Sequence, residues 1–262
     1  MLFKIIFLGD IVGRPGRNAV KEFLPAIISE YSPDLIVANG ENAAGGFGLT
    51  LQVAEELISY GLDVITLGNH TWKNREINKV FENFTQVIRP ANYPPGTPGE
   101  GYGIFTAKNG YKVGIINLMG QVYLDPPLDC PFKVGEEIIK FLMSKTPYIL
   151  LDFHAEATSE KVALGNYLDG MASAVIGTHT HITTADQRIL PHGTGYITDA
   201  GMCGPVDSVL GVKKELAIKK FITKRPVKFE VASGITAVNG VYMEWNQEGK
   251  TVHIERIIFP KK

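Results

Sequence analysis

The chain has 262 residues, of which 45% are hydrophobic and 20% are charged, and its 26 lysines and arginines against 27 aspartates and glutamates leave a formal net charge of −1. This composition excludes a mostly disordered chain, a collagen-like fibre and a polycation that coats nucleic acid. One globular domain of this size can bury a full core, so residues 1–262 are predicted to form a single domain.

The cysteines and the N-terminal segment indicate the compartment. Cys130 and Cys203 lie far apart without a CxxC spacing, so neither a disulfide framework nor a thiolate zinc site is predicted. The apolar start of the chain is interrupted by Lys4 and ends at Asp10 without a cleavage pattern. No apolar run approaches the roughly 18 residues that a membrane span needs. The sequence therefore predicts a cytoplasmic protein that does not contact a membrane.

Short β-branched runs alternate along the chain with segments of helical periodicity. In chain order, the predicted strands are Phe3–Leu8, Asp34–Ala38, Asp63–Leu67, Val113–Asn117, Tyr148–Asp152 and Ser173–Gly177. The predicted helices are Arg17–Tyr31, Leu51–Tyr60, Asn74–Phe84, Gly135–Ser144 and Ser159–Leu168. This alternation is typical of an α/β fold in which helices cover a sheet.

Two segments predict hairpins and therefore mixed sheets. Thr106–Lys112 contains Asn109-Gly110, a strong turn signal, and the C-terminal runs Ala237–Trp245 and Thr251–Phe259 predict a second hairpin. Long loops rich in glycine and proline span residues 40–50, 90–102 and 120–132. Such loops usually carry function or contacts between subunits, and a homo-oligomer is predicted.

Polar side chains collect where the predicted strands end, which is where open α/β sheets bind ligands. They are Asp10, Glu41, Asn42, Asn69, His70, His154, His179 and His181. An isolated histidine after a strand is more often a surface or capping residue than a ligand. The same coincidence at five strand ends favours a metal site, and imidazole together with carboxylate suits iron, manganese or zinc.

The motifs at these positions resemble those of a known family. Asp10-Ile11-Val12-Gly13, Gly40-Glu41-Asn42-Ala43-Ala44-Gly45-Gly46, Gly68-Asn69-His70-Thr71 and Gly177-Thr178-His179-Thr180-His181 are similar in order and spacing to the calcineurin-like metallophosphoesterase superfamily. As a set they most resemble the bacterial YmdB family of 2',3'-cyclic-nucleotide phosphodiesterases.

The resemblance implies a four-layer α/β sandwich, in which two mixed β-sheets pack together between flanking helices and hold two metal ions at one edge. It assigns one metal to Asp10, Glu41, Asn42 and His181, and the other to Glu41, Asn69, His154 and His179, so that Glu41 bridges them. Iron is the first expectation for the metals, with manganese or zinc as alternatives.

This sequence departs from the wider superfamily at three positions. Val12 stands where a histidine ligand is usual, and the adjacent Asn42 is the expected substitute. Glu41 replaces the commoner bridging aspartate. Thr71 replaces the acidic residue that often supports the histidine equivalent to His70.

Two metals about 3.5 to 4 Å apart can clamp both oxygens of a phosphoryl displacement and acidify a bridging water. The expected reaction is in-line attack by that hydroxide, with His70 protonating the leaving alkoxide as general acid. A 2',3'-cyclic nucleotide would then give a 3'-nucleotide. Asn69, Phe47 and Asn92 are the candidate substrate contacts.

The same residues are also compatible with other functions. A phosphomonoesterase or an RNA-end phosphodiesterase would use the same metals, and a regulatory nucleotide- or RNA-binding protein would turn over slowly. The basic stretch Val212–Lys228 predicts an amphipathic helix with a solvated lysine face, or alternatively a surface that tracks RNA.

Overall fold

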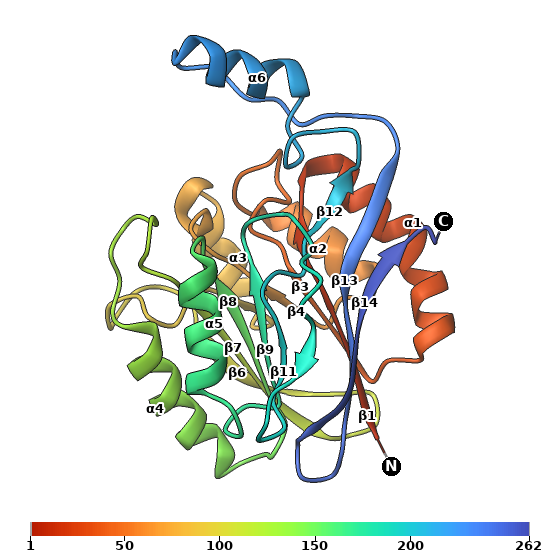
Figure 1. Ribbon diagram of the computed structural model, residues 1–262, viewed down its shortest axis with the longest axis vertical. Helices are drawn as coiled ribbons and strands as arrows, with labels where there is room; N and C mark the ends of the chain where they lie inside the picture. Colours follow the sequence, from red (N-terminus) through yellow and green to blue (C-terminus); the bar gives the residue numbers. More distant parts are fainter. Residues whose placement is uncertain (1, 262) are drawn as a thin grey trace.

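The computed structural model of the protein describes residues 2–261 (Figure 1). One sheet contains β1 (Phe3–Leu8), β2 (Asp10–Ile11), β3 (Leu35–Asn39), β4 (Val64–Thr66), β5 (Val87–Ile88), β12 (Met202–Pro205), β13 (Thr236–Trp245) and β14 (Thr251–Phe259). Its order is β2-β12-β13-β1-β3-β4-β5, with β14 paired to β13. Strands β1, β3, β4 and β5 are parallel, whereas β13 is antiparallel to β1, β12 and β14.

The second sheet contains β6 (Tyr102–Thr106), β7 (Lys112–Met119), β8 (Ile149–His154), β9 (Ala174–Thr178), β10 (Arg188–Ile189) and β11 (Gly195–Ile197). Its order is β10-β11-β9-β8-β7-β6, with four parallel strands between the antiparallel edge strands β6 and β10. Both sheets are therefore mixed, as predicted from the hairpin signals.

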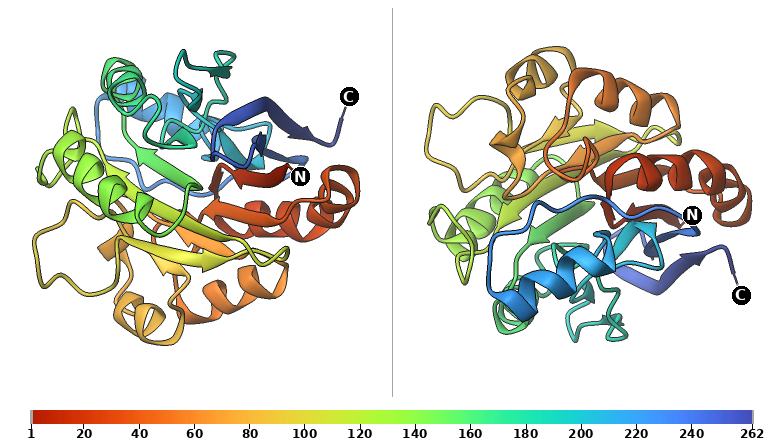
Figure 2. Two further views of the ribbon diagram at one scale, coloured as in Figure 1. Left: turned by 90° about the horizontal axis from the view of Figure 1, so that it is seen from below. Right: turned by 90° about the horizontal axis from the view of Figure 1, so that it is seen from above.

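The paired sheets are flanked on both sides by α1 (Gly13–Tyr31), α2 (Leu51–Ser59), α3 (Ile77–Asn83), α4 (Pro131–Met143) and α5 (Thr158–Tyr167) (Figure 2). The chain also forms a 3₁₀ turn, η1 (Thr71–Lys73), and a further helix, α6 (Lys214–Thr223). The side chain of Thr50 starts α2 by accepting a hydrogen bond from the backbone nitrogen of Val53. Within residues 2–261, no helix is long and apolar enough to cross a membrane.

Side-chain alternation along the strands separates three apolar layers. In β1, Phe3, Ile5 and Phe7 pack into the cluster between the two sheets, whereas Ile6 and Leu8 face the cluster shared with α1 and α2. A third cluster fills the space between the second sheet and helices α4 and α5. The predicted four-layer sandwich of two mixed sheets flanked by helices is confirmed.

Some element boundaries differ from the prediction. Helix α1 begins at Gly13 instead of Arg17, because the periodicity of apolar residues does not mark a first turn that contains glycine and proline. A Cβ on Gly16 would clash with the backbone oxygen of Cys203, so glycine allows α1 to approach β12 closely. Helix α4 likewise begins earlier, at Pro131. Strands β2, β5 and β10 have two residues each and are too short to show alternation.

Helix α6 projects away from the sandwich (Figure 1). Ala217 is its only buried residue within the described chain. Phe221 and Ile222 are 68% and 77% exposed, so the apolar side chains are solvated as well as the lysines. The predicted helix with a solvated lysine face is present, but it lacks the core contact that an amphipathic surface helix normally has.

A buried hydrogen-bond network connects the two sheets. Asp152 on β8 accepts from the amide of Asn39 and the hydroxyl of Thr66 in the first sheet, at 3.1 and 2.5 Å, and from the hydroxyl of Thr178 on β9 at 2.7 Å. Burial raises the pKa of Asp152 to about 6, although His154 and these donors oppose the shift. Three donors thus converge on one buried carboxylate.

We expect Asp152→Ala to lower the free energy of unfolding by about 3 kcal/mol, because it removes three buried hydrogen bonds to a carboxylate and leaves Asn39 and Thr66 with longer ones, of 3.2 and 3.4 Å, to backbone oxygens. Urea denaturation measures the change, and Asp129→Ala at an exposed position is the matched control, with an expected change within about 0.5 kcal/mol. Equal losses in the two variants would contradict the importance of the network.

Candidate metal centre

The carboxyl ends of strands from both sheets meet at one edge of the sandwich, and the predicted ligands lie there. Asp10 opens β2 directly after β1, Glu41 and Asn42 follow β3, and Asn69 follows β4. The second sheet contributes His154, the last residue of β8, and the two histidines that follow β9, His179 and His181.

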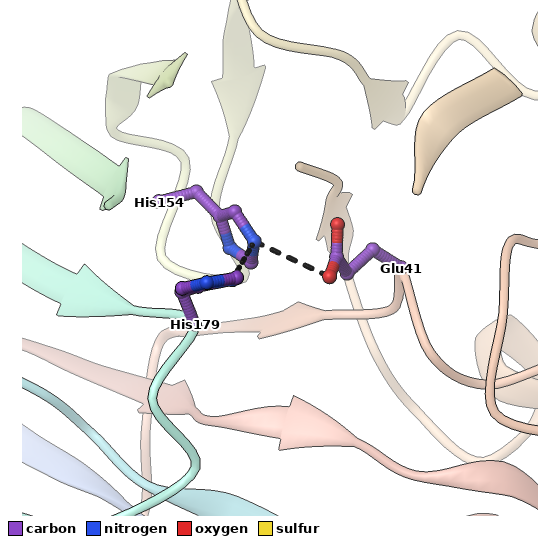
Figure 3. A group of neighbouring side chains, drawn as sticks. All are labelled: Glu41, His154 and His179. Atoms are coloured by element: carbon purple, nitrogen blue, oxygen red, sulfur yellow. Dashed lines mark hydrogen bonds and ion pairs between the residues drawn. The ribbon is translucent and has the colours of Figure 1, made fainter. Parts of the chain in front are cut away.

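The first group brings together Glu41, His154 and His179, whose ligand atoms all lie within 4.8 Å of one another (Figure 3). Nε2 of His154 lies 3.2 Å from Oε1 of Glu41 and 3.0 Å from Nδ1 of His179. The side-chain oxygen of Asn69 lies 2.9 Å from the same Nε2. One of the two predicted ligand sets is therefore assembled at a single point.

The second group surrounds Asp10. Nε2 of His181 lies 3.8 Å from Oδ1 of Asp10, and Nδ2 of Asn42 lies 3.1 Å from both Nε2 of His181 and Oε1 of Glu41. In this orientation the amide nitrogen of Asn42 faces the other side chains, so Asn42 must turn its amide over to offer oxygen to a metal. The other predicted set is also brought together, with Glu41 shared between the two.

An orphaned buried atom tests whether this centre suits a cation. Oδ1 of Asp10 is buried, and no donor within residues 2–261 forms a hydrogen bond to it. Its nearest positively charged candidates are His181 and His154, at 3.8 and 4.0 Å. Because an unpaired buried carboxylate oxygen is costly, this atom and the nitrogen and oxygen donors around it suit a bound metal ion.

The pKa values of the buried His154 and the partly buried His179 are shifted in opposite directions. Burial lowers the pKa of His179 to about 3, so its ring is neutral and has a lone pair for a ligand. Burial also disfavours a charged His154, but the carboxylates of Glu41 and Asp10 outweigh it and raise the pKa of His154 to about 9. Burial would raise the pKa of Glu41, yet His154 and His70 hold it well below its usual range.

His70 lies beside these groups in the wall of a cavity of about 400 Å³. Its Nδ1 is 2.7 Å from Oδ1 of Asn42 and 3.1 Å from Oε1 of Glu41, and its backbone nitrogen donates to Oε2 of Glu41. Thr71 instead donates to the backbone oxygen of Gly68. Asn42, and not the adjacent Thr71, therefore contacts the imidazole of His70.

The two remaining candidate substrate contacts differ in position. The half-exposed ring of Phe47 meets the imidazole of His70 edge-on, with centroids 5.0 Å apart. Asn92 is 1% exposed, and its amide bonds to Met119 and Asp129 backbone atoms. Asn92 therefore joins its own loop to the end of β7 and to the segment before α4, and its predicted contact with substrate stays a prediction.

Sequence patterns missed several residues that support the centre. Glu156 lies 3.0 Å from Nε2 of His179, only two residues beyond the end of β8. Asp199 accepts from both the backbone nitrogen and the hydroxyl of Thr180, between the two histidines, and pairs with the buried Lys161 at 2.7 Å. The one sequence signal for a role of Glu156 is its position just beyond the end of a strand. No sequence signal indicates that Lys161 is buried.

Comparison with known proteins identifies relatives over almost the whole chain. The model of the family described as YmdB-like protein matches residues 6–257. The 2',3'-cyclic-nucleotide 2'-phosphodiesterase of Bacillus subtilis (strain 168) is 52% identical over 256 residues, which cover 97% of this chain and 96% of that protein.

Solved structures agree with this relationship. A hypothetical protein from Thermus thermophilus superposes with a TM-score of 0.91 at 41% identity, covering 98% of this chain and 99% of that one. A phosphatase from Mycoplasma pneumoniae also gives a TM-score of 0.91, at 38% identity, covering 99% and 94% of the two chains. A 5'-nucleotidase precursor from Thermus thermophilus, at 12% identity and a TM-score of 0.57, shares the fold over 98% of this chain and 54% of its own.

We expect Mn²⁺ binding at pH 7.5 to release about one proton, because the metal-free protein holds a proton on His154 between its ordinary pKa of 6.5 and its raised pKa of about 9. Affinity should therefore rise with pH across this window. Titration calorimetry in buffers of different ionisation enthalpy counts the proton. The control is His192→Gln, at an exposed histidine, which should leave the number of released protons unchanged. Mn²⁺ binding without proton release would contradict the assignment of His154 as a ligand that is protonated before the metal binds.

Proposed function

Because this chain belongs to the YmdB-like family, we propose that it is a metal-dependent phosphodiesterase that hydrolyses 2',3'-cyclic nucleotides to 3'-nucleotides. The observation that carries the proposal is the convergence of two ligand groups on the shared carboxylate of Glu41, beside a buried, unpaired oxygen of Asp10. The named activity of the Bacillus subtilis relative, at 52% identity, supplies the cyclic nucleotide as the substrate class.

We propose that two metal ions bind at this centre. One would be held by Asp10, Glu41, Asn42 and His181, and the other by Glu41, Asn69, His154 and His179. Iron is the proposed metal, with manganese or zinc as alternatives that suit the same nitrogen and oxygen donors. When bound, the metals supply the activated water and neutralise charge on the phosphate.

In this proposal, His70 is the general acid that protonates the departing 2' oxygen. Its Nδ1 lies 3.1 Å from Oε1 of Glu41, whichever way the amide of Asn42 is turned, and this leaves Nε2 as the nitrogen that would donate a proton to the substrate. Asn69 would also contact the phosphate, and the exposed ring of Phe47 would pack against the nucleobase. His70 lines a cavity together with Glu41, Asn42, His179 and His181, which supports a phosphate bound at this point.

The wider setting of the enzyme also belongs to the proposal. Residues 1–262 would form a single domain, because both sheets contribute ligands to one centre. Cys130 and Cys203 are both free, which suits the reducing cytoplasm. A homo-oligomer would give the exposed apolar side chains of α6 a partner.

We expect the protein reconstituted with Fe²⁺ or Mn²⁺ to convert 2',3'-cyclic AMP to 3'-AMP. His70→Ala should lower kcat by about 10² to 10⁴ with both metals still bound. His181→Ala should lose turnover and bound metal together. Chromatography identifies the nucleotide and elemental analysis counts the metal, with His192→Ala as the active control. Production of 2'-AMP would contradict the proposed leaving group.

An alternative is a phosphomonoesterase or an RNA-end phosphodiesterase, which the Mycoplasma pneumoniae phosphatase favours through its name and its structural similarity. Faster turnover of monoesters or RNA ends than of cyclic nucleotides would favour it. A further alternative is a regulatory nucleotide-binding protein with slow turnover. In that case His70→Ala would keep both nucleotide affinity and the cellular role after losing hydrolysis.

We also propose RNA contact along residues 213–228. Within the described chain, Lys213 and Lys214 pair with Glu230 and Asp207, whereas Lys219, Lys220 and Lys224 form no ion pair. These three lysines sit on the projecting helix α6 or at its end, and Lys220 also lies over the ring of Phe229 at 4.9 Å, so each could meet a phosphate without breaking an ion pair.

We expect the triple variant Lys219→Ala, Lys220→Ala and Lys224→Ala to reduce the slope of log affinity for single-stranded RNA against log salt by about 2. The double variant Lys213→Ala and Lys214→Ala, at lysines that are already paired, should change the slope less. Fluorescence anisotropy at several salt concentrations measures it. An unchanged slope in the triple variant would remove this surface from the proposal.

A further inference from the structure

The carboxylate of Glu156 and the metal centre lie on opposite sides of one imidazole ring. Nε2 of His179 is 3.0 Å from Oε2 of Glu156, whereas Nδ1 of the same ring is 3.0 Å from Nε2 of His154 and belongs to the group around Glu41. Each ring nitrogen of His179 therefore has a distinct neighbour and a distinct task.

A neutral imidazole carries its proton on one nitrogen and a lone pair on the other, and only the lone pair binds a metal. Because Nδ1 faces the centre, ligation requires the proton to be on Nε2. Histidine ligands usually donate that second N–H to a carboxylate or a carbonyl, which fixes both the tautomer and the ring orientation. Glu156 is the acceptor at the required position.

The backbone fixes where His179 stands but not how its ring is turned. His179 has a left-handed φ of 100°, and the following residue, Thr180, is anchored to Asp199 through its backbone nitrogen and its hydroxyl. The second side-chain torsion of histidine is broad and roughly two-fold, so a half-turn of the ring would move Nδ1 away from the centre. A contact at Nε2 selects one of these orientations.

Other roles for Glu156 suit the geometry less well. Its carboxylate lies at the nitrogen opposite the ligand group, so it is not placed to share a metal with Nδ1 of His179. The Glu156 side chain is 48% exposed, and an ion pair with so much exposure to water contributes little to stability. The contact with Nε2 is then the feature that gives this carboxylate a function.

The chain also connects the two histidines. Glu156 is two residues beyond His154 at the end of β8, and β8 pairs in parallel with β9, which leads into His179. The end of β8 thus carries the proposed ligand His154, and two residues later it carries Glu156, the acceptor for the proposed ligand His179 after β9. A shift of that turn would disturb both histidines together.

We propose that Glu156 is a positioning residue that accepts the Nε2–H of His179 and so presents Nδ1 to the metal. This inference rests on the proposed metal assignment, to which it adds one residue. Glu156 also lines the cavity beside His70, so metal binding and the tautomer of His179, both measured without substrate, are the readouts that identify the positioning role.

The test compares Glu156→Ala, which removes the acceptor, with Glu156→Gln, which keeps an acceptor oxygen without the charge. Long-range proton–nitrogen NMR of the metal-free protein assigns the His179 tautomer, and Mn²⁺ titration against a competing chelator measures affinity. Glu137→Ala, at an exposed glutamate on α4, is the matched control. Circular dichroism verifies that each variant is folded.

We expect the Nε2–H tautomer in the wild type, a mixture of tautomers in Glu156→Ala, and a loss of about 10- to 100-fold in Mn²⁺ affinity at one site of that variant. Glu156→Gln should recover most of the affinity. An unchanged tautomer and affinity in Glu156→Ala would overturn the inference. If the wild type bound no Mn²⁺, the proposed metal centre would fail, while the tautomer of the metal-free protein would still decide the role of Glu156.

Discussion

The buried carboxylate of Asp152 is the constraint on which the metal centre depends, because it joins the two sheets directly beneath it. Asn39 and Thr66 reach it from the first sheet, and Thr178 from the second. The first sheet carries the carboxylates and amides proposed as ligands, and the second carries the three histidines proposed as ligands. The two ligand groups therefore meet only while the sheets keep this alignment.

The same network continues into the ligands. The hydroxyl of Thr178 lies between Asp152 and Nδ1 of His154, at 2.7 and 2.9 Å, so the carboxylate also orients a histidine ring. Beyond Thr178 the backbone enters left-handed conformations at His179 and His181, with φ of 100° and 65°. Such conformations cost about 1 to 3 kcal/mol each, and the pairing of Asp199 with the intervening Thr180 helps to offset that cost.

The protein thus combines a rigid centre with an exposed arm. The proposed ligands are held by buried partners at strand ends, whereas α6 extends from the sandwich with both its lysines and its apolar side chains in solvent. Rigid placement suits a site that must bind metals in fixed geometry. An exposed helix with Phe221 and Ile222 uncovered suits contact with another molecule.

The sequence by itself determined the alternation of strands and helices, the two hairpins and the strand-end positions of the ligands, because periodicity and turn residues act locally. The two-residue strands and the first turns of α1 and α4 carry too little local pattern to be predicted. Only the tertiary structure decided that the amide of Asn92 bonds to the backbone at the end of β7, that Asn42 contacts His70, and that Glu156 faces Nε2 of His179. Each of these depends on segments far apart in the chain, or on the direction of a side chain, which packing alone sets.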